Sequence, residues 1–75
     1  MTFTPGDFKL IQTLDFEIED DEYSHKTRDD VYIQACVYGS YFIPYLWTDK
    51  NTVRHGKTYS NFKQAVEALN RMVSA

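Results

Sequence analysis

Two stretches rich in β-branched and aromatic residues, separated by only two positions, constrain the fold of this chain more than any other feature. Val31–Tyr38 and Tyr41–Thr48 flank the dipeptide Gly39-Ser40. Glycine readily supplies the positive φ that the first position of a type II′ turn requires. The pattern therefore predicts a β-hairpin with a two-residue turn.

The two-residue turn also fixes the register of this hairpin. It pairs Tyr38 with Tyr41, and it places Pro44 opposite Ala35 at a position where the strands exchange no hydrogen bonds. The nitrogen of Pro44 carries no hydrogen, and in this register it points away from the partner strand. We therefore expect Pro44 to be tolerated in the hairpin and to limit pairing along its outer edge.

The segments on either side of the hairpin differ in pattern. Phe8–Glu19 alternates between apolar and polar residues, which predicts a long strand with one buried face. Asp20–Asp30 is polar and crowded with like charges, which predicts a mobile loop. Val53–Tyr59 fits either a short fourth strand or an irregular return through Gly56.

The last part of the sequence predicts an amphipathic helix. Apolar residues recur at helical spacing from Phe62 to Val73, and Ser60 or Asn61 is placed to cap the first turn. The predicted fold class is α+β: a three- or four-stranded antiparallel β-meander with one C-terminal α-helix packed on one face. With 75 residues, the chain is expected to form a single domain, 1–75.

One helix can cover only one face of such a sheet. We expect the aliphatic side to lie under the helix, which leaves an aromatic side uncovered. Tyrosines on a solvent-facing sheet are common because they suit strands, but a contiguous aromatic face is also typical of a contact surface. The residues expected under the helix are Phe8, Leu10, Leu14, Phe16, Ile18, Val31, Ile33, Ala35, Val37, Phe42 and Leu46.

Acidic residues are concentrated in one part of the chain, since eight of the eleven fall between positions 15 and 30. Asp15, Glu17 and Glu19 project from one face of the predicted strand at intervals of about 6.7 Å, twice the ~3.3–3.4 Å rise per residue. That interval is of the same order as the phosphate spacing along nucleic acid. The row is therefore either a solubilising edge or a mimic of a nucleic-acid backbone. The candidate partner-binding residues are Asp15, Glu17, Glu19, Asp20, Asp21, Glu22, Tyr32, Tyr38, Tyr41, Tyr45 and Trp47.

Signatures of enzymes and of cofactor or metal sites are missing from the sequence. It contains no glycine-rich phosphate loop, no cysteine pair and no nucleophile elbow. His25 and His55 lack the spacing of metal ligands and are predicted to be surface histidines. The lone Cys36 cannot form an internal disulfide, and neither a leader nor a membrane-spanning apolar run is recognisable. We expect a non-enzymatic protein of the reducing cytoplasm.

These features predict a small acidic protein-binding module whose partner has a basic surface. A subunit that forms a homodimer through its aromatic face is the first alternative. A single-stranded nucleic-acid-binding domain is the second, although the acidic strand and the net charge of −3 oppose it. In size, acidity and lack of catalytic motifs, the chain resembles small phage and mobile-element proteins that inhibit host machinery. That resemblance covers no motif.

Overall fold

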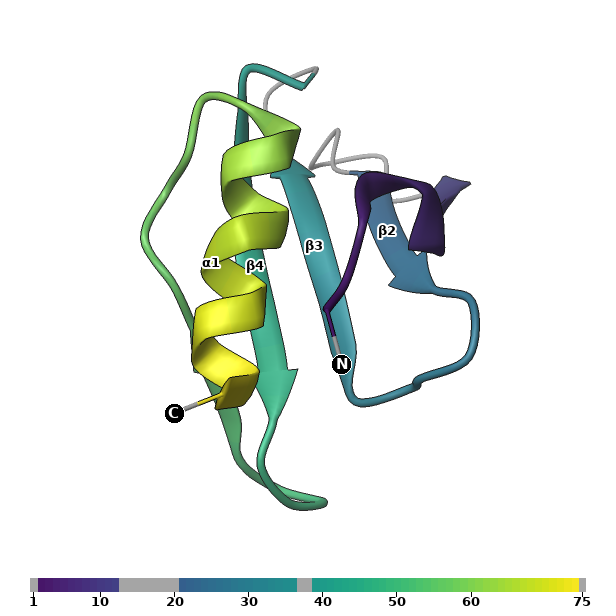
Figure 1. Cartoon of the computed structure of the whole chain (residues 1–75), viewed down its shortest axis with the longest axis vertical. Helices are drawn as coiled ribbons and strands as arrows, with labels where there is room; N and C mark the ends of the chain where they lie inside the picture. The colour runs from purple at the N-terminus through teal and green to yellow at the C-terminus, as the bar shows by residue number, and fades with distance from the viewer. Residues whose placement is uncertain (1, 13–20, 37–38, 75) are drawn as a thin grey trace.

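The computed structural model describes residues 2–12, 21–36 and 39–74. Within these ranges, five antiparallel strands form one sheet in the order β1-β2-β3-β4-β5, and one α-helix packs on it (Figure 1). The predicted α+β class, a meander followed by a C-terminal helix, is confirmed, with five strands in place of three or four. The elements are the 3-10 turn Pro5–Asp7, β1 (Phe8–Gln12), β2 (Asp21–His25), β3 (Val31–Cys36), β4 (Tyr41–Trp47), β5 (Val53–His55) and α1 (Phe62–Ser74).

The strand β2 occupies a segment that was predicted to be a loop. The predicted strand Phe8–Glu19 is confirmed over β1, and positions 13–20 lie outside the described residues. Asp21–His25 pairs with β1 on one side and with β3 on the other, with Tyr23 opposite Ile33. The loop prediction is therefore wrong for this segment. Pairing on both edges outweighs the unfavourable local composition, because β propensity depends strongly on a strand's neighbours.

The β3–β4 hairpin is confirmed, but its register is displaced by two residues. Tyr41 pairs with Cys36, whereas a two-residue turn would pair it with Tyr38. The backbone N–H of Ser40 donates to the carbonyl of Cys36 at 3.1 Å, so the turn is wider than predicted. Gly39 has a φ of 78°, which confirms the need for glycine in this turn. A displacement of two leaves every side chain on its predicted face.

The outer edge of β4 is paired on both sides of Pro44. The carbonyl of Pro44 accepts a hydrogen bond from the N–H of Gly56 at 2.9 Å, so its backbone faces away from β3 as expected. Beyond the proline, Phe42 and Tyr59 exchange two backbone hydrogen bonds of 2.6 and 2.8 Å. The prediction that Pro44 limits pairing on this edge is thus wrong. Gly56 permits the close approach, because a Cβ there would lie 2.7 Å from Pro44 Cγ.

The helix α1 packs on one face of the sheet, over β4 and beside β3 (Figure 1). Asn61 is its cap, since Asn61 Oδ1 accepts hydrogen bonds from the N–H groups of Lys63 at 2.8 Å and Gln64 at 3.4 Å. The aliphatic side of β3 and β4 faces the helix as predicted, but Leu10 of β1 is 43% exposed. Four other residues predicted to lie under the helix are outside the described residues: Leu14, Phe16, Ile18 and Val37. Over the described residues, no helix is long and apolar enough to cross a membrane. The buried core cluster consists of Phe3, Phe8, Val31, Ile33, Ala65, Val66 and Leu69.

The segment before β1 belongs to this core, which the sequence did not predict. Phe3 is only 3% exposed, and its backbone N–H donates to Asn70 Oδ1 at 2.6 Å. Asn70 Nδ2 in turn donates to the carbonyl of Phe3 at 3.0 Å. The ring of Phe3 meets the rings of Phe8 and His25 edge-on, with centroids 6.1 and 5.0 Å apart. The N-terminal segment thus extends the cover that α1 gives to β3 and β4.

Candidate protein-binding face

The side of the sheet that is turned away from α1 is called the open face here. Along β3, buried residues alternate with half-buried ones, and the half-buried set belongs to the open face. Alternation along β4 places Tyr41, Tyr45 and Trp47 on this side, as predicted, and Phe42 on the helix side, because successive strand residues point to opposite faces. Tyr41 and Trp47 are each 39% exposed. The residues that the pairing assigns to the open face include Lys9, Ile11, Glu22, Ser24, Tyr32, Gln34, Cys36, Tyr41, Ile43, Tyr45, Trp47, Val53 and His55.

A stacked pair of tyrosines occupies the centre of the open face. The rings of Tyr32 and Tyr45 are nearly parallel, at 4°, with centroids 4.6 Å apart. The hydroxyl of Tyr45 donates to Gln34 Oε1 at 2.9 Å, and the ring of His55 lies 6.1 Å from that of Tyr45. Burial, followed by the charges of Tyr45 and Glu22, raises the pKa of Tyr32. The Tyr32 phenol is therefore neutral at physiological pH, and the stacked pair Tyr32–Tyr45 is called the aromatic platform.

Trp47 is the last residue of β4, and its side chain lines two shallow hollows. Its backbone N–H donates to the carbonyl of Asp30 at 2.7 Å, which ties this end of β4 to the segment before β3. The first hollow, of about 480 Å³, is lined by Asp29, Asp30, Trp47, Thr48, Asp49 and Lys50. The second, of about 380 Å³, is lined by Glu22, Ser24, His25, Arg28, Asp29, Val31, Tyr32 and Trp47.

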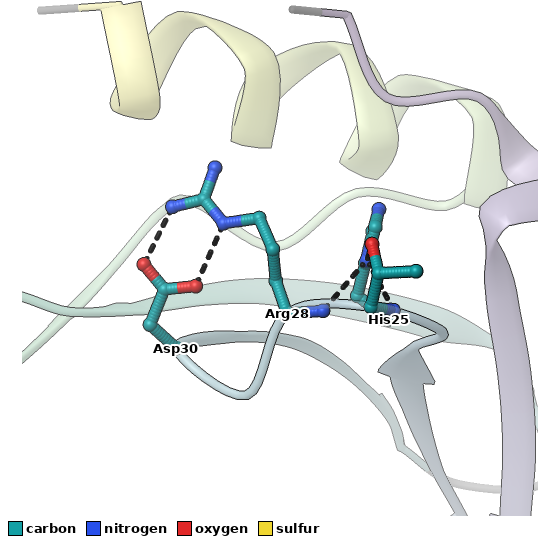
Figure 2. Close-up of polar contacts among 4 residues, drawn as sticks. His25, Arg28 and Asp30 are labelled. Atoms are coloured by element: carbon teal, nitrogen blue, oxygen red, sulfur yellow. Dashed lines mark hydrogen bonds and ion pairs between the residues drawn. The ribbon is translucent and has the colours of Figure 1, made fainter.

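Carboxylates gather around Trp47, and two of them are held by local hydrogen bonds. Figure 2 shows Arg28 and Asp30 turned toward each other in a two-point ion pair, with N···O distances of 2.8 and 2.5 Å. The hydrogen bond from Arg28 lowers the pKa of Asp30. Asp49 Oδ1 accepts from the backbone N–H of Asn51 at 2.8 Å, which lowers the pKa of Asp49. Both groups are therefore ionised at neutral pH.

The depressed carboxyl pKa values predict that acid weakens the fold. In the folded chain, the pKa of Asp30 and that of Asp7, whose carboxylate accepts from the N–H of Thr4 at 2.8 Å, lie below the ordinary 3.8. Their contribution to stability is present above that value and is lost as the pH falls through the folded-state pKa. We expect the urea concentration at the unfolding midpoint to fall when the pH is lowered below 3.8. Asp30→Asn should remove part of this pH dependence. A midpoint unchanged between pH 6 and pH 3 would contradict this expectation.

His25 is buried, so the prediction of a surface histidine is wrong at this position. Its Nδ1 accepts hydrogen bonds from the backbone N–H groups of Thr27 and Arg28, each at 3.1 Å (Figure 2). This arrangement selects the tautomer with the proton on Nε2. Nε2 is buried without a hydrogen-bond partner among the described residues. The imidazole packs edge-on with the rings of Phe3 and Phe8, with centroids 5.0 and 5.3 Å apart. The role of His25 is to hold the turn that positions Arg28.

The predicted acidic surface is only partly placed by the structure. Asp21 and Glu22 are neighbours on β2, and strand alternation turns them to opposite faces: Asp21 pairs with Ala35 on the helix side, and Glu22 pairs with Gln34 on the open face. Glu22 is therefore brought beside the tyrosines, and Asp21 is not. The other predicted site residues on the open face are Tyr32, Tyr41, Tyr45 and Trp47, while Asp15, Glu17, Glu19, Asp20 and Tyr38 lie outside the described residues.

Asp29 and Asp49 were missed by the sequence interpretation of the site. Asp29 precedes β3 and Asp49 follows β4, and the start of one antiparallel strand lies beside the end of its partner. The hairpin prediction already implied this proximity. The two carboxylates could have been placed beside Trp47 had their positions relative to the strand ends been considered.

Among the residues that the structure describes, no three His, Cys, Asp or Glu side chains are grouped so as to hold a metal ion. A scan against models of known protein families found no match, and searches of curated proteins and of solved structures found none either. Any function assigned to this face must therefore be argued from its geometry.

Proposed function

We propose that this protein is a small non-enzymatic binding module of the cytoplasm that docks a protein partner with a basic surface through its open face. One observation carries the proposal. The helix and the N-terminal segment pack on one side of the sheet, and the described ranges contain no second α-helix to cover the other side, where Tyr32 and Tyr45 stack. Contiguous exposed aromatic surface is typical of interaction sites, where Trp and Tyr supply much of the binding energy.

The charge around this surface supports a basic partner. Glu22 lies on the open face, and Asp29 and Asp49 lie beside Trp47 at its end. Complementary charge steers association and selects partners. The acidic row Asp15, Glu17, Glu19 and Asp20 would extend such a surface. Its mimicry of a nucleic-acid backbone, and with it the inhibition of a nucleic-acid-handling protein, stays a prediction because these residues lie outside the described part of the chain.

Comparison of one open-face variant with one helix variant tests this function. We expect the wild type and Gln64→Ala, a change on the exposed side of α1, to retain the same protein from an extract of the native host. Trp47→Ala should lose it, because truncating an interface hot spot weakens binding by about 2 kcal/mol or more, roughly thirtyfold. Retention should also fall as salt is raised. Mass spectrometry of the retained proteins, with circular dichroism to confirm folding, provides the readout.

Equal retention by all three proteins would reject the open face as the docking surface. Insensitivity to salt would reject the basic partner. Addition of nuclease to the extract separates a protein partner from one held through nucleic acid, since only the latter is released.

Self-association is the second candidate function, and the outer strand β1 favours it. Leu10 and Ile11 are 43% and 46% exposed, one on each face of a strand that pairs only with β2 among the described elements. Unpaired strand edges readily pair with another chain. Sedimentation velocity over a range of concentrations distinguishes the two candidates: a dimer that Ile11→Lys dissociates and Trp47→Ala leaves intact would assign β1 to self-association.

A further inference from the structure

We infer that the end of the open face around Trp47 seats an arginine side chain of the partner, with the guanidinium stacked on the indole and paired with Asp29. This inference rests on the proposed function and identifies the chemistry by which the open face would recognise its partner. It places the seat at one end of the aromatic platform, next to the stacked pair Tyr32–Tyr45.

The geometry around Trp47 fits a flat cationic group. Trp47 is 39% exposed and lines both hollows, as does Asp29. A side chain that enters either hollow therefore meets an aromatic ring and a carboxylate at once. The backbone N–H of Trp47 donates to the carbonyl of Asp30 at 2.7 Å. This bond holds the backbone of Trp47 against the segment that carries Asp29. The seat is thus held in place before a partner arrives.

The charges around the indole favour a cation. Four carboxylates and two cationic side chains line the two hollows, so the formal net charge is −2. Arg28 and Asp30 neutralise each other's charge in an ion pair. Neither Glu22 nor Asp29 makes an ion pair with another described residue. Three carboxylates, those of Glu22, Asp29 and Asp49, therefore remain for a partner, against one cation, that of Lys50. The carboxylates are Glu22, Asp29, Asp30 and Asp49, and the cations are Arg28 and Lys50.

Arginine suits this seat better than lysine. Its guanidinium is planar, stacks on aromatic faces and offers a fork of N–H donors that matches a carboxylate, whereas the lysine ammonium is a strongly hydrated point charge. The same chain offers an internal precedent. Arg28 places its guanidinium carbon 5.2 Å from the centroid of the Phe3 ring while it pairs with Asp30. The proposed seat would repeat that combination of ring and carboxylate for an incoming side chain.

Because Trp47 is the only tryptophan of the chain, its fluorescence reports on the seat directly. A short oligoarginine peptide is titrated into the protein at low salt. We expect a saturable change in emission that an oligocitrulline peptide of the same length does not produce, because citrulline keeps the planar shape and lacks the charge. Oligolysine should bind about three- to tenfold more weakly than oligoarginine, since the stacking and the two-point pairing are lost.

Two variants with the same change in charge locate the binding. Asp29→Asn should weaken the oligoarginine affinity about three- to fivefold, as expected for one exposed ion pair. Glu67→Gln, on the exposed side of α1, removes one negative charge away from the open face and should bind like the wild type. The chemical shift of the Trp47 indole N–H provides a second readout that does not depend on emission intensity.

Three results would overturn the arginine seat. The first is equal binding of oligoarginine and oligocitrulline, the second is an equal effect of Asp29→Asn and Glu67→Gln, and the third is a change in emission with protein concentration alone, which would assign the surface to a second copy. If the seat fails while Trp47→Ala still loses the partner from the extract, the proposed function stands with a different contact chemistry. If oligoarginine binds while Trp47→Ala keeps the partner, the proposed function fails instead.

Discussion

Phe3→Ala is expected to lower the free energy of unfolding by about 3–5 kcal/mol, the usual cost of removing a buried phenylalanine side chain. The ring is 3% exposed and fills the space among Phe8, His25 and the guanidinium of Arg28. Its loss would leave a cavity in the core cluster, between the N-terminal segment and the sheet. Total stabilities of small domains are about 5–15 kcal/mol, so the variant should be marginally folded. Urea unfolding followed by far-UV circular dichroism measures the change.

Two milder substitutions keep this prediction testable if Phe3→Ala does not fold. Phe3→Leu should lower the stability by about 1–1.5 kcal/mol, because it roughly preserves the apolar volume. Thr2→Ala, at an exposed neighbouring position, should stay within about 0.5 kcal/mol of the wild type. If Phe3→Ala unfolds at the wild-type urea concentration, the N-terminal segment does not belong to the core.

Leu69→Ala should cost about 2–5 kcal/mol, the range for truncating a buried leucine. Leu69 is 0% exposed and lies in the same cluster as Val31 and Ile33 of β3, so its loss detaches part of α1 from the sheet. Gln64→Ala, on the exposed side of the helix, is the matched control and should change the stability by less than about 0.5 kcal/mol. Thermal unfolding by circular dichroism distinguishes them. A wild-type melting temperature for Leu69→Ala would contradict the packing described for α1.

Leu69 and Phe3 show which parts of the core could be predicted from the sequence and which could not. Leu69 was predicted to be buried because apolar residues recur at helical spacing from Phe62 to Val73, and a helix on a sheet must bury that stripe. Phe3 belongs to no periodic pattern. It is held by Asn70, a polar residue of the helix whose amide pairs with the backbone of Phe3. Periodicity detects contacts within an element, and it does not detect a contact between segments so distant in the chain.

The hairpin shows why the faces were predicted correctly while the register was not. A displacement of two residues keeps each side chain on its face, so the expectation that Ile33 is buried and Tyr32 lies opposite holds in both registers. It also leaves the nitrogen of Pro44 turned toward the outer edge in both. The face of each side chain and the orientation of the Pro44 nitrogen are therefore the same in both registers, so neither feature distinguishes the two. The length of the turn decides between them, and local turn chemistry alone did not identify it.

For the candidate site, alternation within the hairpin was sufficient to place Tyr45 and Trp47 together on the open face. It failed for the acidic residues because Asp21–His25 was not recognised as a strand. A run of like charges has low β propensity, and here it is outweighed by pairing on both edges. The carboxylate best placed beside the indole, Asp29, lies in the connection between two strands, where no periodic pattern exists.

The two hydrogen bonds between Phe3 and Asn70 join positions that are 67 residues apart. A ribosome that adds ~5–20 residues per second makes Asn70 roughly 3–13 s after Phe3. During that interval, the apolar rings at the start of the chain have no helix to pack against. Folding of the nascent chain can therefore be completed only after the helix has been synthesised, and until then Phe3 and Phe8 are exposed to chaperones and to neighbouring chains.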